Sequence, residues 1–425
     1  MNIVMFTNTY TPHVGGVARS VEAFAASYRS RGHRVLVVAP EFPGMPENET
    51  DVVRIPAIQN FNGSDFSVVL PVSGLLTETL DAFQPDIVHS HHPYLLGVTA
   101  LRVARFRQLP LVFTHHTRYE DYTHYVPGNA PMLRRFIIEV AVRYSNLADQ
   151  VFAPSESIAD LLRERGVESE IEVVPTGVAL DQFREGDGVA FRARSGIPAD
   201  AFVTGHLGRL APEKNIEFLS ESIAAFLQED SRVHCLIAGV GPAEQTLREI
   251  FERQGLIARL HFAGLLKQPQ LSNALHAMDV FAFASRSETQ GMVLTEAMAA
   301  SVPVVALDAP GAREVVRDGI NGRLLMQESV SEFADALRWV AQQPEAQRLE
   351  LRQAAYRTAE SFSMENMAER ALSCYARMRA QTPAEQATQD QNWQQLLNLV
   401  KVEWEILKGI GSATESALVE RDEPK

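Results

Sequence analysis

The sequence predicts an α/β protein of two successive units, each a parallel sheet with helices on both faces. The chain has 425 residues, which is enough for two domains of ordinary size. Short apolar runs alternate with amphipathic stretches, and this pattern requires crossover connections and therefore parallel strands. The alternation pauses once, through Pro175–Phe183 and Glu185–Gly188, so we expect a domain boundary near residue 184. Two such units in tandem normally bind a ligand in the cleft between them, outside the carboxyl ends of the strands.

The first unit is expected over residues 1–184. Its strands are short apolar runs, and its helices place apolar residues at helical spacing. The expected strands are Ile3–Phe6, Arg34–Ala39, Asp86–His89, Leu111–Thr114, Gln150–Ala153 and Ile171–Val174. The expected helices are Val17–Arg31, Leu95–Arg107, Met132–Leu147 and Ser155–Arg165, with Ser155 as an N-cap.

The second unit is expected over residues 185–362. Its expected strands are Val203–Leu207, Arg232–Ala238, Arg259–Phe262, Val280–Ala284 and Val302–Ala306. Its expected helices are Asn215–Leu227, Pro242–Arg253, Met292–Ala300 and Ser331–Gln342, followed by Arg348–Glu360. A helix within residues 363–380 should pack back on the first unit. Residues 381–425 should form a linker, an amphipathic helix around Trp393–Leu407 and a disordered tail.

Composition and charge exclude several classes of protein. The chain is 46% apolar and 22% charged, as in soluble globular proteins. A net charge of -14 argues against general nucleic-acid binding, but it leaves room for a local basic patch at an anionic membrane. Cys235 and Cys374 stand far apart in apolar stretches, so we expect two core thiols in a reduced compartment. No apolar run approaches the roughly 18 residues of a spanning helix, and the N-terminus is too short and uncharged for a signal peptide. The expected location is cytoplasmic.

The stretch Ser285–Ala299 contains the first candidate site. It follows an apolar run and leads into an expected helix, so it reads as a strand-to-helix loop. Free backbone N–H groups at Gly291–Val293 suit an anion, and Gly291 lets a phosphate approach closely. Glu288 and Glu296 would accept hydrogen bonds from sugar or ribose hydroxyls. The combination indicates a nucleotide-sugar pocket, whereas either acid alone reads as an ordinary loop acid or a solvated helix residue.

Two cations form the second candidate motif. Arg209 and Lys214 lie in Gly208–Asn215, which follows the first expected strand of the second unit. At the carboxyl edge of a sheet they can neutralise a diphosphate leaving group without a metal. Taken alone they also fit two ordinary surface cations.

Two segments of the first unit could also contact a ligand. Gly15 and Gly16 follow the first strand, and a glycine turn before a helix allows an anion to approach the backbone, although it can equally be a mere turn. Phe113–Tyr125 is crowded with polar aromatic residues, including His115 and His116. No acid–histidine spacing typical of metal ligands occurs there, so we expect no metal site, and most of these residues also fit a structural role.

Together these motifs resemble the retaining glycosyltransferases of family 4, whose two Rossmann-like domains face each other across a cleft in the GT-B arrangement. The resemblance covers roughly residues 1–380. It rests on the Gly-Arg…Lys loop at 208–214 and on the pair of glutamates at 288 and 296, which stand in the expected order. It implies transfer of a hexose from a nucleotide sugar with retention of configuration, and it implies no cofactor and no metal.

The resemblance also implies roles for individual residues. Arg209 and Lys214 would hold the diphosphate, and Glu288 and His116 would act at the donor sugar. The donor-binding residues that it implies are Gly16, Gly208, Gly291, Met292, Val293 and Glu296. The acceptor-side residues that it implies are Tyr119, Glu120 and Asp121.

Two segments narrow the resemblance to bacterial diacylglycerol glucosyltransferases. These are His116–Tyr122 and Glu288–Gly291, of which close variants occur in that group. They imply a UDP-sugar donor, UDP-glucose first, and a lipid hydroxyl acceptor such as diacylglycerol. The protein would then work peripherally on the inner face of the membrane. Gln290 stands where many family members have an aromatic residue, and Ser301 stands where glycine is common.

Two expected helices could mediate binding to partners. Met132–Leu147 carries an apolar stripe with Arg134, Arg135 and Arg143 beside it, which fits an interfacial helix on anionic lipid or a core helix with solvated arginines. The expected helix at Trp393–Leu407 would pack on the body of the protein or form a homo-oligomer.

Three other functions fit parts of the same pattern. A family 4 enzyme with a soluble or polysaccharide acceptor would not need vesicles. A nucleotide-sugar epimerase would release a changed nucleotide sugar with no acceptor present. A non-catalytic nucleotide-sugar sensor would bind the donor without turnover.

Overall fold

The computed structural model describes residues 1–13, 15–58, 68–69, 74–118, 130–286 and 288–381. The contacts within the chain divide it into two compact units, one formed by residues 1–176 together with the chain from Met367 on, the other by Gly177–Asn366. This division differs from the expected boundary near residue 184, because Val178 and Phe183 pack in a core cluster of the second unit. Val178 also exchanges backbone hydrogen bonds with Phe362 and Met364, which fixes this segment to the second unit.

The first unit contains a sheet of seven parallel strands in the order β3-β2-β1-β6-β7-β8-β9. The strands are β1 (Asn2–Phe6), β2 (Arg34–Pro40), β3 (Val52–Ile55), β6 (Ile87–Ser90), β7 (Leu111–Thr114), β8 (Gln150–Ala153) and β9 (Ile171–Val173). A separate antiparallel pair joins β4 (Ala57–Ile58) and β5 (Val68–Val69). All six strands predicted for this unit are confirmed, whereas β3, β4 and β5 were not predicted.

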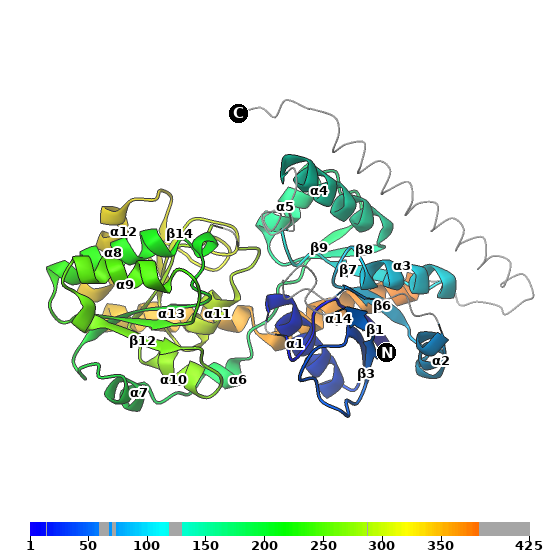
Figure 1. Ribbon diagram of the computed structural model, residues 1–425, viewed down its shortest axis with the longest axis horizontal. Helices are drawn as coiled ribbons and strands as arrows, with labels where there is room; N and C mark the ends of the chain where they lie inside the picture. Colours follow the sequence, from blue (N-terminus) through cyan, green and yellow to red (C-terminus); the bar gives the residue numbers. More distant parts are fainter. Residues whose placement is uncertain (14, 59–67, 70–73, 119–129, 287, 382–425) are drawn as a thin grey trace, which may run out of the picture. The chain divides into compact units, whose positions relative to one another are not determined.

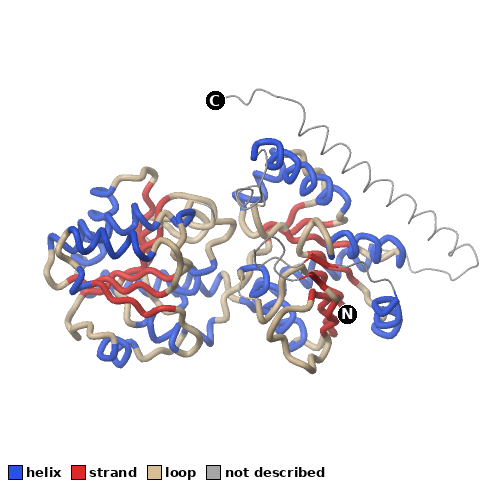
Figure 2. The backbone as a smooth tube through the Cα atoms, in the orientation of Figure 1, coloured by secondary structure: helices blue, strands red, loops and turns tan. Residues whose placement is uncertain are grey.

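Helices cover both faces of this sheet (Figures 1 and 2). The helices are α1 (Gly16–Ser30), α2 (Gly74–Phe83), α3 (Leu96–Arg107), α4 (Ala130–Leu147), α5 (Glu156–Glu164) and α14 (Met364–Gln381). A core cluster joins α2, α3, α4 and α5 to one face of the sheet. On the other face Tyr28 of α1 and Tyr375 of α14 are fully buried and lie edge to face. The predicted N-cap of α5 is confirmed, because Ser155 Oγ accepts a hydrogen bond from the Ile158 N–H.

The second unit contains a sheet of six parallel strands in the order β12-β11-β10-β13-β14-β15. The strands are β10 (Phe202–Leu207), β11 (Val233–Ala238), β12 (Leu260–Gly264), β13 (Val280–Phe283), β14 (Val304–Leu307) and β15 (Gly322–Leu325). The five predicted strands are confirmed, and β15 is an additional strand at the edge. In both sheets the order reverses at the first strand, between β1 and β6 and between β10 and β13. Such switch points form crevices at the carboxyl edge of a parallel sheet, where ligands bind.

The helices of the second unit form two layers (Figure 1). One apolar cluster contains residues of α8 (Ile216–Glu229), α9 (Glu244–Arg253) and α12 (Val330–Gln342). The second cluster, on the opposite face, contains residues of α6 (Leu180–Phe183), α7 (Gly188–Arg194), α10 (Gln270–His276), α11 (Met292–Ala299) and α13 (Glu345–Ser361). Both faces of the sheet are therefore buried, which leaves its carboxyl edge for ligands.

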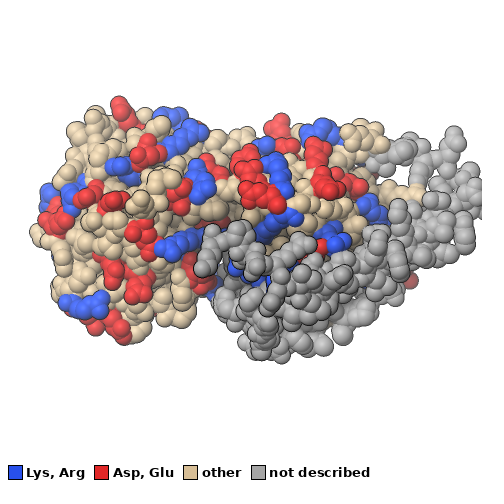
Figure 3. Space-filling model, turned by 90° about the horizontal axis from the view of Figure 1, so that it is seen from above, with Lys and Arg blue, Asp and Glu red and all other residues tan. Residues whose placement is uncertain are grey.

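Surface charge and helix composition were two further expectations from the sequence. On the face drawn in Figure 3, basic and acidic side chains of the described residues are interspersed. Within the described part of the chain, no helix has the length and the apolar character that crossing a membrane requires. The expected linker, helix and tail at 382–425 lie outside the described residues.

Candidate functional site

The switch point between β10 and β13 brings the two predicted motifs of the second unit together. Gly208 and Arg209 follow β10, Lys214 ends a short 3-10 turn before α8, and Glu288 follows β13. Lys214 Nζ donates a hydrogen bond to the Glu288 carboxylate, although the two residues are 74 positions apart in sequence. Their side chains are only 23% and 17% exposed, so water screens this ion pair weakly. Arg209, the other predicted cation, does not contact Glu288 in this way. Its side chain is half-exposed and forms an ion pair with Glu213.

The start of α11 completes this side of the site. Gly291 is the N-cap residue, with a left-handed φ of 70°, and as a glycine it has no side chain that could cap the helix. The first backbone N–H groups of a helix have no partner within it, so those at Met292 and Val293 can bind an anion. Glu296 lies one turn further on and is only 4% exposed. Its interpretation as a solvated helix residue is therefore wrong.

Two buried polar side chains at these strand ends did not emerge as candidates from the sequence. His206 lies on β10, and its Nδ1 donates to the Ala282 carbonyl oxygen (3.0 Å). Burial lowers the pKa of His206 to about 4, so the ring is neutral. His206 Nε2 and Ser285 Oγ are buried and have no hydrogen-bond partner among the described residues. The only sequence signal for His206 is a histidine inside an otherwise apolar strand.

In the first unit the corresponding switch point lies between β1 and β6. Helix α1 begins at Gly16, and its N-cap residue Gly15 has no side chain that could cap the first turn. A Cβ built on Gly16 would meet nothing within 4 Å, so a ligand can approach the backbone at this position. The predicted role of Gly16 in anion binding is compatible with this geometry and stays a prediction.

The predicted sugar-contacting histidine forms a pair with a second histidine. His116 follows β7, His91 follows β6, and His91 Nδ1 lies 2.8 Å from His116 Nε2. Burial lowers the pKa of both imidazoles well below the ordinary value, so both rings are neutral. The predicted acceptor-side residues Tyr119, Glu120 and Asp121 lie outside the described residues, so their role also stays a prediction.

Asn8 ties the loops after β1 and β6 together. Its backbone N–H donates to His92 Nδ1 (3.1 Å), and its side-chain amide donates to the Tyr94 carbonyl oxygen (3.0 Å). Its side-chain oxygen accepts a hydrogen bond from the Leu96 N–H (3.1 Å), at the start of α3. Three backbone segments at the carboxyl edge are therefore held in fixed positions.

The buried histidines should make the protein less stable in mild acid. Burial lowers the pKa of His89 and of His92 to about 3, whereas an unfolded histidine titrates near 6.5. Below pH 6.5 the unfolded chain therefore binds protons that the folded chain does not, and stability falls as the pH falls. Between pH 7 and pH 5 each of the two should remove about 2 kcal/mol from the free energy of unfolding. Urea unfolding at several pH values measures this slope.

His92→Asn offers the test, because an asparagine oxygen can accept the Asn8 N–H in place of Nδ1. The variant should show a smaller loss between pH 7 and pH 5, by about 2 kcal/mol, whatever its stability at pH 7. Identical slopes for the variant and the wild type would contradict the argument.

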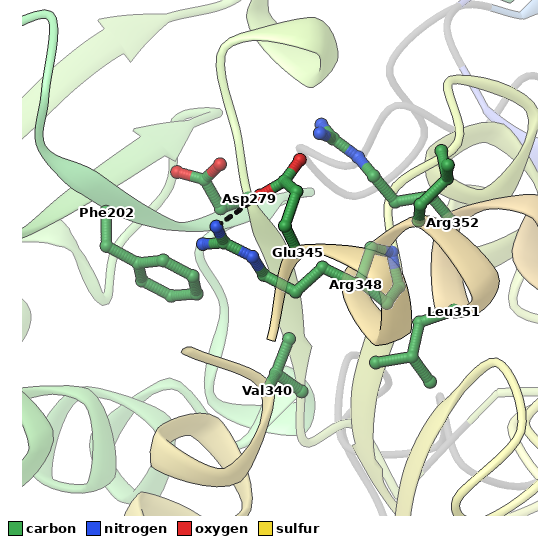
Figure 4. A pocket seen from close by; sticks show the side chains of 9 residues that line it. Phe202, Asp279, Val340, Glu345, Arg348, Leu351 and Arg352 are labelled. Atoms are coloured by element: carbon green, nitrogen blue, oxygen red, sulfur yellow. Dashed lines mark hydrogen bonds and ion pairs between the residues drawn. The ribbon is translucent and has the colours of Figure 1, made fainter. Parts of the chain in front are cut away.

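A pocket in the second unit lies away from these residues (Figure 4). It is lined by Phe202 at the start of β10, by Asp279 just before β13, and by residues of α12 and α13. Arg348, which also lines it, donates to Glu345 at 2.5 Å. The pocket is thus at the amino edge of the sheet, opposite the edge that carries Lys214 and Glu288.

Comparison with known proteins agrees with this geometry. Residues 14–182 match the family model described as Glycosyltransferase Family 4, and residues 189–359 match the model described as Glycosyl transferases group 1. The chain is 30% identical over 331 residues to the alpha-monoglucosyldiacylglycerol synthase of Streptococcus pneumoniae, which covers 76% of this chain and 75% of that protein. It is 30% identical over 339 residues to the protein of the same name from Acholeplasma laidlawii, which covers 76% of this chain and 84% of that protein.

Solved structures show the same fold. Anabaena Alr3699/HepE in complex with UDP superposes with a TM-score of 0.72 at 21% identity, over 89% of this chain and 100% of that chain. The two parallel-sheet units described above are therefore those of the GT-B fold. With both family models matched in order, the chain belongs to the glycosyltransferases of family 4.

Proposed function

We propose that the protein transfers a glucosyl residue from UDP-glucose to the hydroxyl of a membrane lipid such as diacylglycerol, with retention of configuration. The observation that supports transfer most directly is the shielded Lys214–Glu288 pair near the start of α11, where the N-cap residue is a glycine. It unites a cation, a carboxylate and free backbone N–H groups, which are the groups that a sugar diphosphate needs. The choice of glucose and of a lipid rests on the names of the two relatives that are 30% identical.

In the donor complex, Lys214, Arg209 and the first N–H groups of α11 would bind the diphosphate. Lys214 would then turn from Glu288 to the phosphate oxygens, and Arg209 would leave Glu213. The released Glu288 carboxylate would accept hydrogen bonds from the sugar hydroxyls, and Glu296 would accept them from the ribose. On donor binding, the two cations would therefore exchange their carboxylate partners for the oxygens of the diphosphate.

The reaction would proceed by attack of the acceptor hydroxyl on the face from which the diphosphate departs. The new bond forms between the acceptor oxygen and the anomeric carbon while the bond from that carbon to the phosphate oxygen breaks. The hydroxyl proton passes to the departing phosphate oxygen. Negative charge grows on the diphosphate during this step, and the two cations and the helix terminus stabilise it.

The surface of the first unit gives limited support to the lipid acceptor. On α3, Phe106 is exposed, and Arg102 on the same helix is exposed as well. The predicted interfacial stripe on α4 is only half-buried at Phe136 and Val140, whereas Tyr144 is buried and donates to the Gly97 carbonyl oxygen. The C-terminal end of α4 is therefore a core element, and the proposed contact with lipid concerns the half-buried stretch around Phe136 together with α3.

A donor-consumption assay tests the proposal. The protein is incubated with UDP-glucose, with and without phosphatidylglycerol vesicles that contain diacylglycerol, and UDP and new lipid are measured. We expect UDP release that depends on diacylglycerol, together with an α-glucosyl lipid identified by the coupling of its anomeric proton. GDP-mannose and UDP-galactose are the matched donors, and they should react at a small fraction of the rate.

Each alternative function gives a different result in the same assay. If UDP is released with a soluble acceptor and no vesicles, the protein is a glycosyltransferase, but its acceptor is not a lipid. A changed nucleotide sugar in the absence of acceptor would indicate an epimerase. Donor binding without turnover under every condition would indicate a sensor, and the proposal would then be wrong.

A further inference from the structure

The hydrogen bond between His91 and His116 couples the proton positions of the two rings. Both rings are neutral, so each carries one N–H and one lone pair. The contact joins His91 Nδ1 to His116 Nε2, so one of these atoms must donate and the other must accept. If His91 Nδ1 donates, His116 carries its own proton on Nδ1, and His91 Nε2 is an acceptor. If His116 Nε2 donates, His116 Nδ1 is an acceptor, and His91 Nε2 is a donor.

The pair therefore always has one donor and one acceptor at its two outer ends, and the two ends exchange roles together. The outer end on His91 is Nε2, which is buried and has no hydrogen-bond partner among the described residues. His91 itself is only 1% exposed. No group among the described residues fixes this end as a donor or as an acceptor.

The His91 ring also packs against His89, with the ring centroids 4.1 Å apart and the ring planes tilted by 34°. His89 is in turn hydrogen-bonded to a residue of α14. Both nitrogens of His89 have partners, because Nδ1 lies 2.6 Å from the Tyr375 hydroxyl and Nε2 lies 2.7 Å from Thr114 Oγ1. This contact restrains the His91 ring, and no described residue bonds to its Nε2.

We propose that His91 is a positioning residue that controls which ring nitrogen of His116 carries the proton. This inference rests on the proposed function in one respect, namely that His116 contacts the donor sugar. Through His91, His116 Nδ1 can serve as a donor or as an acceptor toward a hydroxyl without becoming charged. A charged imidazolium is disfavoured at this buried position, so a change of tautomer is the way in which His116 can adapt to its ligand.

Nitrogen-15 NMR of the protein labelled at the histidine ring nitrogens tests the inference without any activity. The protonated and unprotonated nitrogens of a neutral imidazole have well-separated shifts, and His116→Gln identifies the signals of His116. In the wild type we expect averaged shifts for His116 that reflect two tautomers. His91→Phe removes the partner of Nε2 but keeps a flat ring against His89, so His116 should show a single tautomer.

Kinetics give the second readout. His91→Phe should lower the turnover number roughly tenfold to a hundredfold, the range of a lost proton-handling group, and leave the KM for UDP-glucose within about threefold. His91→Asn, which can still donate or accept at the position of Nδ1, should retain more activity than His91→Phe. His92→Asn is the matched control, because it alters a neighbouring buried histidine whose Nδ1 bonds to Asn8, and it should leave the His116 shifts unchanged.

The outcomes separate this inference from the proposed function. Unchanged His116 shifts and unchanged turnover in His91→Phe would overturn the role of His91. If His91→Phe changes the His116 shifts but the wild-type protein transfers no sugar, the two histidines are coupled as proposed and the proposed function is wrong. If His91→Phe does not fold, His91→Asn decides, since it should shift the tautomer balance of His116.

Discussion

Replacing Lys214 by alanine should lower the turnover number for glucosyl transfer roughly a hundredfold, because one cation opposite the departing diphosphate is lost. The Lys214–Glu288 ion pair is largely shielded from water, so the charge of the ammonium acts in a weakly screened environment. The substitution also leaves the Glu288 carboxylate beside the incoming diphosphate without its cation, and like charges repel. Steady-state kinetics with UDP-glucose and diacylglycerol vesicles measure the loss.

Two further variants make this result specific. Arg253→Ala removes the same charge at the last residue of α9, on a helix that returns from β11 to the amino edge of the sheet, so turnover should stay at the wild-type level. Lys214→Ala combined with Glu288→Gln should cost less than the sum of the two single changes, because the two residues interact directly. Glu296→Gln, one helical turn beyond the anion site, should abolish transfer while circular dichroism shows an intact fold. Normal turnover in Lys214→Ala would exclude Lys214 from the site.

Buried central strands are the elements that the local sequence predicts best. Leu111–Thr114 and Gln150–Ala153 match their strands residue for residue, since central parallel strands are continuous apolar runs. Strands β3 and β15 were missed because both are edge strands that contain an arginine and are only partly buried. The contacts divide the chain at residue 176, before the expected boundary near residue 184, whereas the two matched family models meet between residues 182 and 189. Composition shows where the strand pattern pauses, but it does not show which core Val178 and Phe183 join.

The sequence predicted the motifs of the candidate site, but it did not predict which residues of different motifs contact each other. Each motif lies within one strand-loop-helix segment, so its residues could be predicted from a short stretch of sequence. The Lys214–Glu288 pair and the His91–His116 pair each require that two particular strands lie side by side. Strand order is a property of the whole sheet, and no local pattern encodes it.

Replacing Gly239 by alanine should damage both stability and activity, although no donor-binding role was predicted for this residue. Gly239 follows β11 with a φ of 144°, a conformation that other residues rarely adopt. A Cβ at this position would lie 1.8 Å from the Gly208 carbonyl oxygen and 2.9 Å from its carbonyl carbon. Backbone atoms cannot rotate away as a side chain can. The Gly208–Arg209 segment would have to move, and we expect a loss of roughly 3 kcal/mol or more in the free energy of unfolding.

Gly255→Ala is the matched control for backbone strain. Gly255 lies in the same unit and also has a positive φ, of 70°, but a Cβ there would meet nothing within 4 Å. It should cost only about 1–2 kcal/mol, the penalty of the left-handed conformation alone, and leave turnover unchanged. Gly239→Ala should instead lower turnover and weaken UDP-glucose binding at temperatures where it is still folded, because Gly208 and Arg209 belong to the proposed diphosphate site. Equal stability and equal turnover in the two variants would contradict this prediction. The Gly208 loop could then move to admit a Cβ at Gly239 without loss of function.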